Sequence, residues 1–334
     1  MTVASSSRRK FLALVFGILT AQLNISDAQE SHVPRVGILW IAPQPVVAPF
    51  HEAFRQGLRD LGYLEGRTLI IEARFADSRI ELLPTLAEEL VRLNVDVVVA
   101  PATPSVSALR RATATIPIVM ANVSDPVGFG FVASLRQPGG NITGFSNLMV
   151  EQIGKNVELA KEVLPNLARL AVLANPAAPD AAVAVREANA ASRTLGFTVN
   201  SVEARQPGDL EDAVARAKGL ASDALLVSTI EGFFFASRAR IIDAAAKDRI
   251  PTIFAAPPFG LAQAGALLAY GANTPDMLRR TATYVDKIIK GAKPAELPVQ
   301  QPVLFELGVN MKTARSLGLT IPLSILVRAD EVIE

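Results

Sequence analysis

Ten residues of this chain place a polar or aromatic side chain at, or directly after, the end of a predicted strand. In sheets of parallel strands, the groups that bind ligands gather at the carboxyl ends of the strands. Hydroxyl, amide and carboxyl groups there can hydrogen-bond a small solute, and aromatic rings can stack on it. The set therefore predicts non-covalent capture of a small organic molecule. The ten candidates are Trp40, Thr103, Ser105, Asp125, Ser146, Asn147, Asn175, Thr229, Glu231 and Tyr270.

Thr103 and Ser105 stand on either side of Pro104 at a predicted helix N-terminus. Free backbone N–H groups and the helix dipole favour an anion there, such as a ligand carboxylate, although Thr103 could instead serve only as the cap of the helix. Thr229 and Glu231 occupy the equivalent place in the second half of the chain. Glu231 could pair with a ligand ammonium, or could be a solvated glutamate in a first helical turn. A carboxylate site opposite an ammonium site would define an α-amino acid.

Trp40 is the only tryptophan and follows the first predicted strand directly. An aromatic ring there can stack on a planar ligand at low entropy cost, and packing at the rim of a domain is the alternative.

Asn175 follows the first strand of the second half, where turn formation competes with ligand binding. Tyr270 ends the last strand of that half. In the run 233–235, Phe233 could form part of a pocket wall.

Three further candidates lie toward the end of the first half. Asp125 precedes a proline and is followed by Gly128, so an Asx-type turn competes with a ligand contact. Ser146 and Asn147 lie where the chain crosses from one half to the other, and a role in a hinge competes there with hydrogen bonding to a ligand.

Catalytic chemistry has no visible basis in this sequence. The two histidines, His32 and His51, belong to no plausible Ser–His–Asp or Cys–His arrangement, and the chain has no cysteine. No spacing typical of metal ligands, phosphate-binding Walker loop or GxGxxG fingerprint is present. We therefore expect no cofactor, no metal and no enzyme.

The elements that position these residues occur twice in the same order. Apolar strands are predicted at 36–40, 68–75, 95–100 and 116–119, separated by helices that end near 62, 93 and 113. From residue 170 the order recurs, with strands at 171–175, 198–203, 224–228 and 250–253 and helices ending near 195 and over 208–218 and 234–247. The continuous apolar runs indicate parallel strands that are buried on both faces. The fold class is therefore α/β, with two doubly wound parallel-sheet lobes and a cleft between them.

The end of the chain belongs to neither repeat. A helix over 274–290, an extended link, a strand over 303–309 and a short helix over 311–317 are predicted. We expect an N-terminal lobe of residues 33–146 plus 272–300 and a C-terminal lobe of residues 147–271 plus 301–334. The chain then crosses between the lobes three times, near residues 146, 271 and 300, which is typical of a three-strand hinge.

The N-terminus has the pattern of an export signal. Three basic residues at 8–10 precede the apolar run 11–21, which is too short to span a bilayer, and the small residues Ser26 and Ala28 predict cleavage after Ala28. The segment SRRKFL is similar to a twin-arginine signal. With no cysteine to carry a lipid anchor, we expect a protein free in the periplasm.

Charge excludes one class of partner. Removal of residues 1–28 takes away a net charge of +2, so the formal net charge of +1 becomes about −1. That balance provides no basic field for nucleic acid or for an anionic membrane.

Longer stretches resemble a known family. They include 36–39 (VGIL), 57–66 (GLRDLGYLEG), 116–119 (IPIV), 124–128 (SDPVG), 134–144 (SLRQPGGNITG), 290–295 (KGAKPA) and 310–319 (NMKTARSLGL). Together they are similar to the substrate-binding proteins of ABC transporters, in the family that includes tryptophan and tyrosine binders. The resemblance implies the type I periplasmic-binding-protein fold and covers nearly the whole mature chain. At 254–260 (FAAPPFG) the sequence departs from the more polar segment of many relatives.

The resemblance implies a function and a partner. An amino acid or aromatic acid would be captured between the lobes and delivered by a monomer to an ABC permease in the inner membrane. Closure of the lobes would follow from tighter binding by the closed form. The alternatives are a periplasmic receptor that reports its ligand to a signalling partner, and an exported α/β enzyme that uses Asp125 and Glu231 as acid and base.

Overall fold

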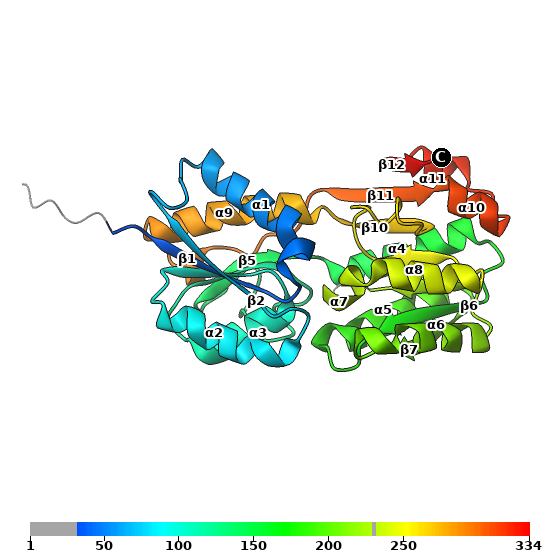
Figure 1. Cartoon of the computed structure of the whole chain (residues 1–334), viewed down its shortest axis with the longest axis horizontal. Helices are drawn as coiled ribbons and strands as arrows, with labels where there is room; N and C mark the ends of the chain where they lie inside the picture. The colour runs from blue at the N-terminus through cyan, green and yellow to red at the C-terminus, as the bar shows by residue number, and fades with distance from the viewer. Residues whose placement is uncertain (1–31, 229–231) are drawn as a thin grey trace, which may run out of the picture. The chain divides into compact units, whose positions relative to one another are not determined.

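The computed structural model describes residues 32–228 and 232–334. Residues Pro34–Glu334 form one compact unit that contains two sheets. Figure 1 shows helices on both faces of the sheets. The α/β class with two parallel sheets is thus confirmed.

The first sheet has five parallel strands in the order β2-β1-β3-β4-β5. Helices α1 and α9 pack on one face, whose core includes Val36, Ile38 and Trp40, and helices α2 and α3 cover the core around Leu39 and Val98 (Figure 1). The strands are β1 Arg35–Trp40, β2 Ile70–Phe75, β3 Val97–Ala100, β4 Ile118–Val123 and β5 Ile142–Ser146; the helices are α1 Gln44–Asp60, α2 Leu83–Arg92, α3 Thr103–Ala112 and α9 Thr274–Ile289.

The second sheet repeats this order and extends it. Its strands run β12-β11-β10-β9-β8-β6-β7, so β7-β6-β8-β9-β10 reproduces the first sheet, and β11 adds antiparallel to β10. The strands are β6 Arg169–Ala174, β7 Thr198–Glu203, β8 Ala224–Val227, β9 Thr252–Phe254, β10 Leu268–Ala272, β11 Phe305–Asn310 and β12 Glu331–Ile333. The helices are α4 Met149–Val163, α5 Pro179–Leu195, α6 Leu210–Gly219, α7 Gly232–Ala236, α8 Arg238–Lys247, α10 Met311–Leu317 and α11 Leu323–Leu326. The domain bounds given above stay a prediction.

Some predicted elements were wrong in detail. The helix expected over 234–247 is two helices, α7 and α8, because the backbone turns at Ser237, whose φ and ψ are −96° and 13°. The helix expected to end near 93 begins as a 3₁₀ turn, Ile80–Leu82, before α2. Helix α4, helix α11 and strand β12 were not predicted.

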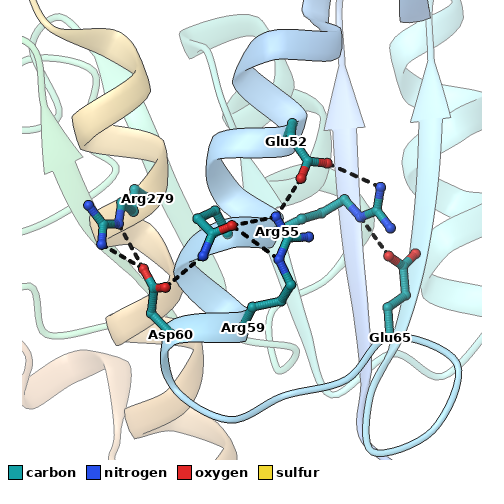
Figure 2. Close-up of polar contacts among 7 residues, drawn as sticks. Glu52, Arg55, Arg59, Asp60, Glu65 and Arg279 are labelled. Carbon is teal, nitrogen blue, oxygen red and sulfur yellow. Dashed lines mark hydrogen bonds and ion pairs between the residues drawn. The ribbon is translucent and has the colours of Figure 1, made fainter.

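Helix α9 returns from the second sheet to pack on α1, and Gly57 permits the close approach. A Cβ on Gly57 would lie 2.2 Å from the carbonyl oxygen of Arg279. Exposed charges surround this contact: Asp60 pairs with Arg279 at 2.7 Å, while Glu52, Arg55, Arg59 and Glu65 form a chain along the surface (Figure 2). Exposed ion pairs contribute little to stability, so close packing at Gly57 matters more than this network.

Candidate functional site

One pocket lies at the carboxyl ends of strands from both sheets. Its lining includes Trp40 at the end of β1, Ala42 after it, Ala102 after β3, and Ala255 and Ala256 after β9. In the first sheet, β1 connects to β2 on one side and β3 connects to β4 on the other side. Doubly wound folds bind ligands at such a point, where the strand order reverses. The empty volume, including the part open to solvent, is about 1060 Å³.

Aromatic rings form one wall of this pocket. Phe50 on α1 lies 5.9 Å from Phe235 on α7 and 5.1 Å from Phe259, measured between ring centroids. Trp40 also lines the pocket and is only 5% exposed. Phe235, instead of the expected Phe233, reaches the pocket, because Phe233 and Phe234 are buried in the core. The wall suits a ligand with a flat apolar part.

Uncharged polar groups provide the rest of the recognition chemistry. The polar lining residues are Ser105, Asn122, Asn147, Gln152 and Thr274. Of the described residues that line this pocket, none carries a charged side chain. A zwitterion or a neutral solute fits such a lining better than a strongly charged one, because a buried net charge needs a partner.

Ser105 has the strongest signature of a ligand-binding side chain. It is fully buried, its hydroxyl oxygen has no hydrogen-bond partner among the described residues, and it lies in the first turn of α3. A buried polar atom without a partner costs free energy, so an occupant that pairs with it is favoured. The backbone N–H groups of the same turn favour a ligand carboxylate.

Thr103 does not cap α3 as expected. Ala102 occupies the N-cap position, and the Thr103 hydroxyl donates instead to Asp180 Oδ1 at 3.3 Å. The hydroxyl of Ser124, after β4, also donates to Asp180 Oδ1. Because Asp180 lies in the first turn of α5, these hydrogen bonds connect the two sheets next to the pocket.

Burial determines the protonation of Asp180. The carboxyl group is 2% exposed and its Oδ2 has no hydrogen-bond partner among the described residues. Desolvation raises the pKa of Asp180 above its ordinary value of 3.8, the hydroxyls of Ser124 and Thr103 oppose that shift, and nearby Asp125 adds to it. The ionised carboxylate is therefore less stable here than in water.

Asp180→Asn is expected to leave the free energy of unfolding unchanged or raise it by about 1 kcal/mol at neutral pH, because an amide oxygen still accepts both hydroxyls without a charge. Since the folded pKa is raised, the contribution of wild-type Asp180 is most favourable at low pH and diminishes as the pH rises from 3.8 through the raised pKa. Urea unfolding at about pH 7.5 and pH 5 measures both effects. A variant that is clearly less stable at pH 7.5 would contradict this account.

Three segments cross between the sheets, and side chains at the pocket connect two of them. Gln152 on α4 donates to the carbonyl oxygen of Asn147 and accepts from the backbone N–H of Ala272 at 3.1 Å. The backbone of Gln300 bonds to Gly144 and Ser146 at 2.8 and 2.9 Å. A ligand that touches Asn147 or Gln152 thus touches residues that hold the crossing segments.

The other sequence candidates have structural partners. Asp125 Oδ1 accepts from Gly128 N–H at 2.8 Å, and Asn175 Oδ1 accepts from Ala177 N–H at 3.0 Å, as in Asx turns. Ser146 is buried at the end of β5, and Tyr270 stacks on Phe305 at 5.9 Å. These residues, like Thr103, do not line the pocket, whereas Trp40, Ser105 and Asn147 do. Thr229 and Glu231 lie outside the described residues.

Sequence reasoning missed Phe50, Asn122, Gln152 and Asp180. Phe50 lies within a helix and Asn122 within β4, away from the strand ends that guided the prediction. Asp180 could have been found from its place in the first turn of α5, the equivalent of helix α1 in the repeat. Gln152 could have been found only with α4.

Other site types have no support in the part of the chain that the structure describes. Residues 32–228 and 232–334 contain no cluster of three or more His, Cys, Asp or Glu side chains that could hold a metal. Over the same ranges, no helix has the length and hydropathy needed to cross a membrane.

Comparison with known proteins places this pocket in a family. The profile of the ABC transporter substrate-binding proteins matches residues 35–333. A tyrosine-binding protein of Clostridioides difficile (strain R20291) is 26% identical over 284 residues, 85% of this chain and 81% of that protein. An ABC domain from Streptococcus pneumonia in complex with L-Trp is 26% identical with a TM-score of 0.82, over 90% of this chain and 99% of that one.

A ligand-free, open substrate-binding protein with adhesive properties from Clostridium difficile is 25% identical over the same shares, 90% and 99%, with a TM-score of 0.66. These likenesses, together with the two sheets described above, show the type I periplasmic-binding-protein fold. The matched range covers nearly every residue described above, and the chain therefore belongs to the ABC transporter substrate-binding protein family, whose members bind substrates and are not enzymes.

Proposed function

We propose that this protein captures an amino acid or aromatic acid in the pocket between its sheets and delivers it to an ABC permease. The proposal rests on two neighbouring features: an aromatic wall, and the buried hydroxyl of Ser105 at a helix N-terminus, which has no hydrogen-bond partner among the described residues. Two relatives support the ligand class, one a tyrosine-binding protein and the other in complex with L-Trp.

Each part of such a ligand has a proposed partner. The carboxylate would accept hydrogen bonds from Ser105 and the first turn of α3, and the ring would lie against Trp40. Asn147 would hydrogen-bond the ligand from the first crossing segment. Glu231, with Thr229, would receive the ammonium, as the sequence predicts; both residues lie outside the described part of the chain.

Substrate-binding proteins of ABC transporters act outside the cytoplasm. We propose that this chain acts in the periplasm as a monomer, after removal of residues 1–28. N-terminal sequencing of the protein exported by its host is expected to find Gln29 as the first residue. A chain that retains Met1 would contradict the proposed cleavage.

Native mass spectrometry of the purified mature protein, followed by denaturation, tests the ligand class. A stoichiometric amino acid or aromatic acid released on denaturation is the expected result. If the protein is empty, a thermal-shift series of amino acids and aromatic acids replaces that measurement, and L-tryptophan or L-tyrosine is expected to raise the Tm. Release of a sugar, or no response to any member of the series, would overturn the assignment of the ligand class while leaving the family unchanged.

A further inference from the structure

The indole of Trp40 is held by a single titratable side chain. Its Nε1–H donates to His51 Nδ1 at 3.2 Å, and the two ring centroids are 6.1 Å apart. His51 lies on α1, while Trp40 ends β1 and lines the pocket. The family assignment and the proposed function give His51 no role.

The direction of this hydrogen bond determines the protonation state of the imidazole. An indole nitrogen can only donate, so His51 Nδ1 must accept and its proton must be on Nε2. A protonated imidazole carries N–H groups on both nitrogens and would point a donor at the Trp40 N–H. The contact therefore exists only with neutral His51.

The surroundings of His51 favour the neutral form. Burial lowers the pKa of His51 below its ordinary value of 6.5, and the positive charge of Arg55 lowers it further, whereas Glu65 and Glu52 oppose both. Arg55 is itself paired with Glu52 at 3.2 Å and with Glu65 at 2.6 Å (Figure 2), which limits its influence on the imidazole.

We propose that neutral His51 is a positioning residue for Trp40, holding the indole in the pocket wall, and that protonation of His51 releases the indole. The pocket is then fully assembled near neutral pH and loosened in acid. Because the folded pKa is lowered, the contribution of this contact is complete above 6.5 and is lost as the pH falls from 6.5 through the folded pKa. The effect of His51 protonation on ligand affinity rests on the proposed function, whereas its effect on the position of Trp40 does not.

The single tryptophan makes the contact directly observable without a ligand. In ¹⁵N-labelled, ligand-free protein, the one indole N–H resonance is expected to shift between about pH 8 and pH 5, with a midpoint below 6.5. His51→Gln supplies an amide oxygen that accepts the same hydrogen bond at every pH, so its resonance should stay in the high-pH position. His32→Gln removes the other histidine and should leave the transition unchanged.

Two results of that titration would overturn the proposal: a wild-type resonance that does not move, or a transition that persists in His51→Gln. Circular dichroism at each pH confirms that the protein stays folded. These outcomes do not depend on what the pocket binds.

Binding of L-tyrosine, followed by calorimetry, tests the consequence. Between about pH 7.5 and pH 5.5 the wild-type affinity is expected to fall by less than about tenfold, since one proton competes with one ligand and the folded pKa of His51 lies below 6.5, while the His51→Gln affinity stays constant. An equal fall in both proteins would overturn the proposed link to binding. If L-tyrosine binds at no pH, the ligand assignment fails and the resonance titration still decides the role of His51.

Discussion

Gly144→Ala is expected to lower the free energy of unfolding by about 3–5 kcal/mol, because no side chain fits where β4 and β5 pair. Gly144 has φ of +127°, and a Cβ there would lie 2.0 Å from the carbonyl oxygen of Met120 and 2.8 Å from its nitrogen. The register of β4 and β5 shifts directly after the Met120–Gly144 pair. The Gly144 carbonyl also accepts from Gln300, in the third crossing segment.

A matched glycine provides the control. Gly154 lies in α4, and no atom outside the adjoining backbone of that helix comes within 4 Å of an added Cβ, so Gly154→Ala should stabilise the protein by about 0.5–1 kcal/mol. Urea unfolding of both variants measures the difference, and the two midpoints should move in opposite directions. An unchanged midpoint for Gly144→Ala would show that β4 and β5 are not this close in solution.

The architecture followed from the repeat in the sequence because the central strand of each half, β3 and β8, is a continuous apolar run that is buried along its length. Two chain segments with the same alternation of strands and helices gave the same strand order, 2-1-3-4-5, in both sheets. The segment NITG at 141–144 contributed to the family resemblance, and the structure supplies its physical reason in the backbone of Gly144.

Helix α4 was missed although its signal is present. Ile153, Val157 and Ala160 are buried at helical spacing, but the segment lies between the two repeats, where the repeated order of elements predicts no helix. The break between α7 and α8 carries no comparable signal, because no proline or glycine marks Ser237.

Three of the candidate site residues could be placed from strand ends alone: Trp40, Ser105 and Asn147 line the pocket. Asp125 and Asn175 occupy similar positions in the sequence and form turns instead. The difference depends on the direction of each side chain after its strand, which a sequence pattern does not specify. The two hydroxyl groups that donate to Asp180 come from residues 56 and 77 positions away along the chain, and a local sequence pattern does not predict such a contact.

The chain as a whole superposes more closely on a ligand-bound relative than on an open one. At the same coverage and nearly the same identity, the TM-score is 0.82 against the complex with L-Trp and 0.66 against the ligand-free, open protein. The aromatic contacts of Phe50 join the two halves of the chain, because Phe50 is on α1, which packs on the first sheet, while Phe235 is on α7 and Phe259 follows β9 of the second sheet.

Phe50→Ala is expected to weaken binding of L-tyrosine or L-tryptophan roughly fivefold to 150-fold. Two aromatic contacts between the sheets are lost, each worth about 0.5–1.5 kcal/mol, so closure becomes less favourable by about 1–3 kcal/mol. A ligand that binds the closed form must then supply that free energy from its own affinity. Phe259→Ala, which removes one contact from a ring that is 39% exposed, should have a smaller effect.

Phe129→Ala is the matched control, because Phe129 pairs with Phe131 at 5.8 Å but does not line the pocket. Calorimetry should find its affinity for the same ligand unchanged. Small-angle scattering of ligand-free Phe50→Ala should give a larger radius of gyration than wild type if the aromatic contacts favour closure. Equal losses of affinity in Phe50→Ala and Phe129→Ala would instead attribute the effect to general loosening of the fold, and the contact between the sheets would then have no specific part in binding.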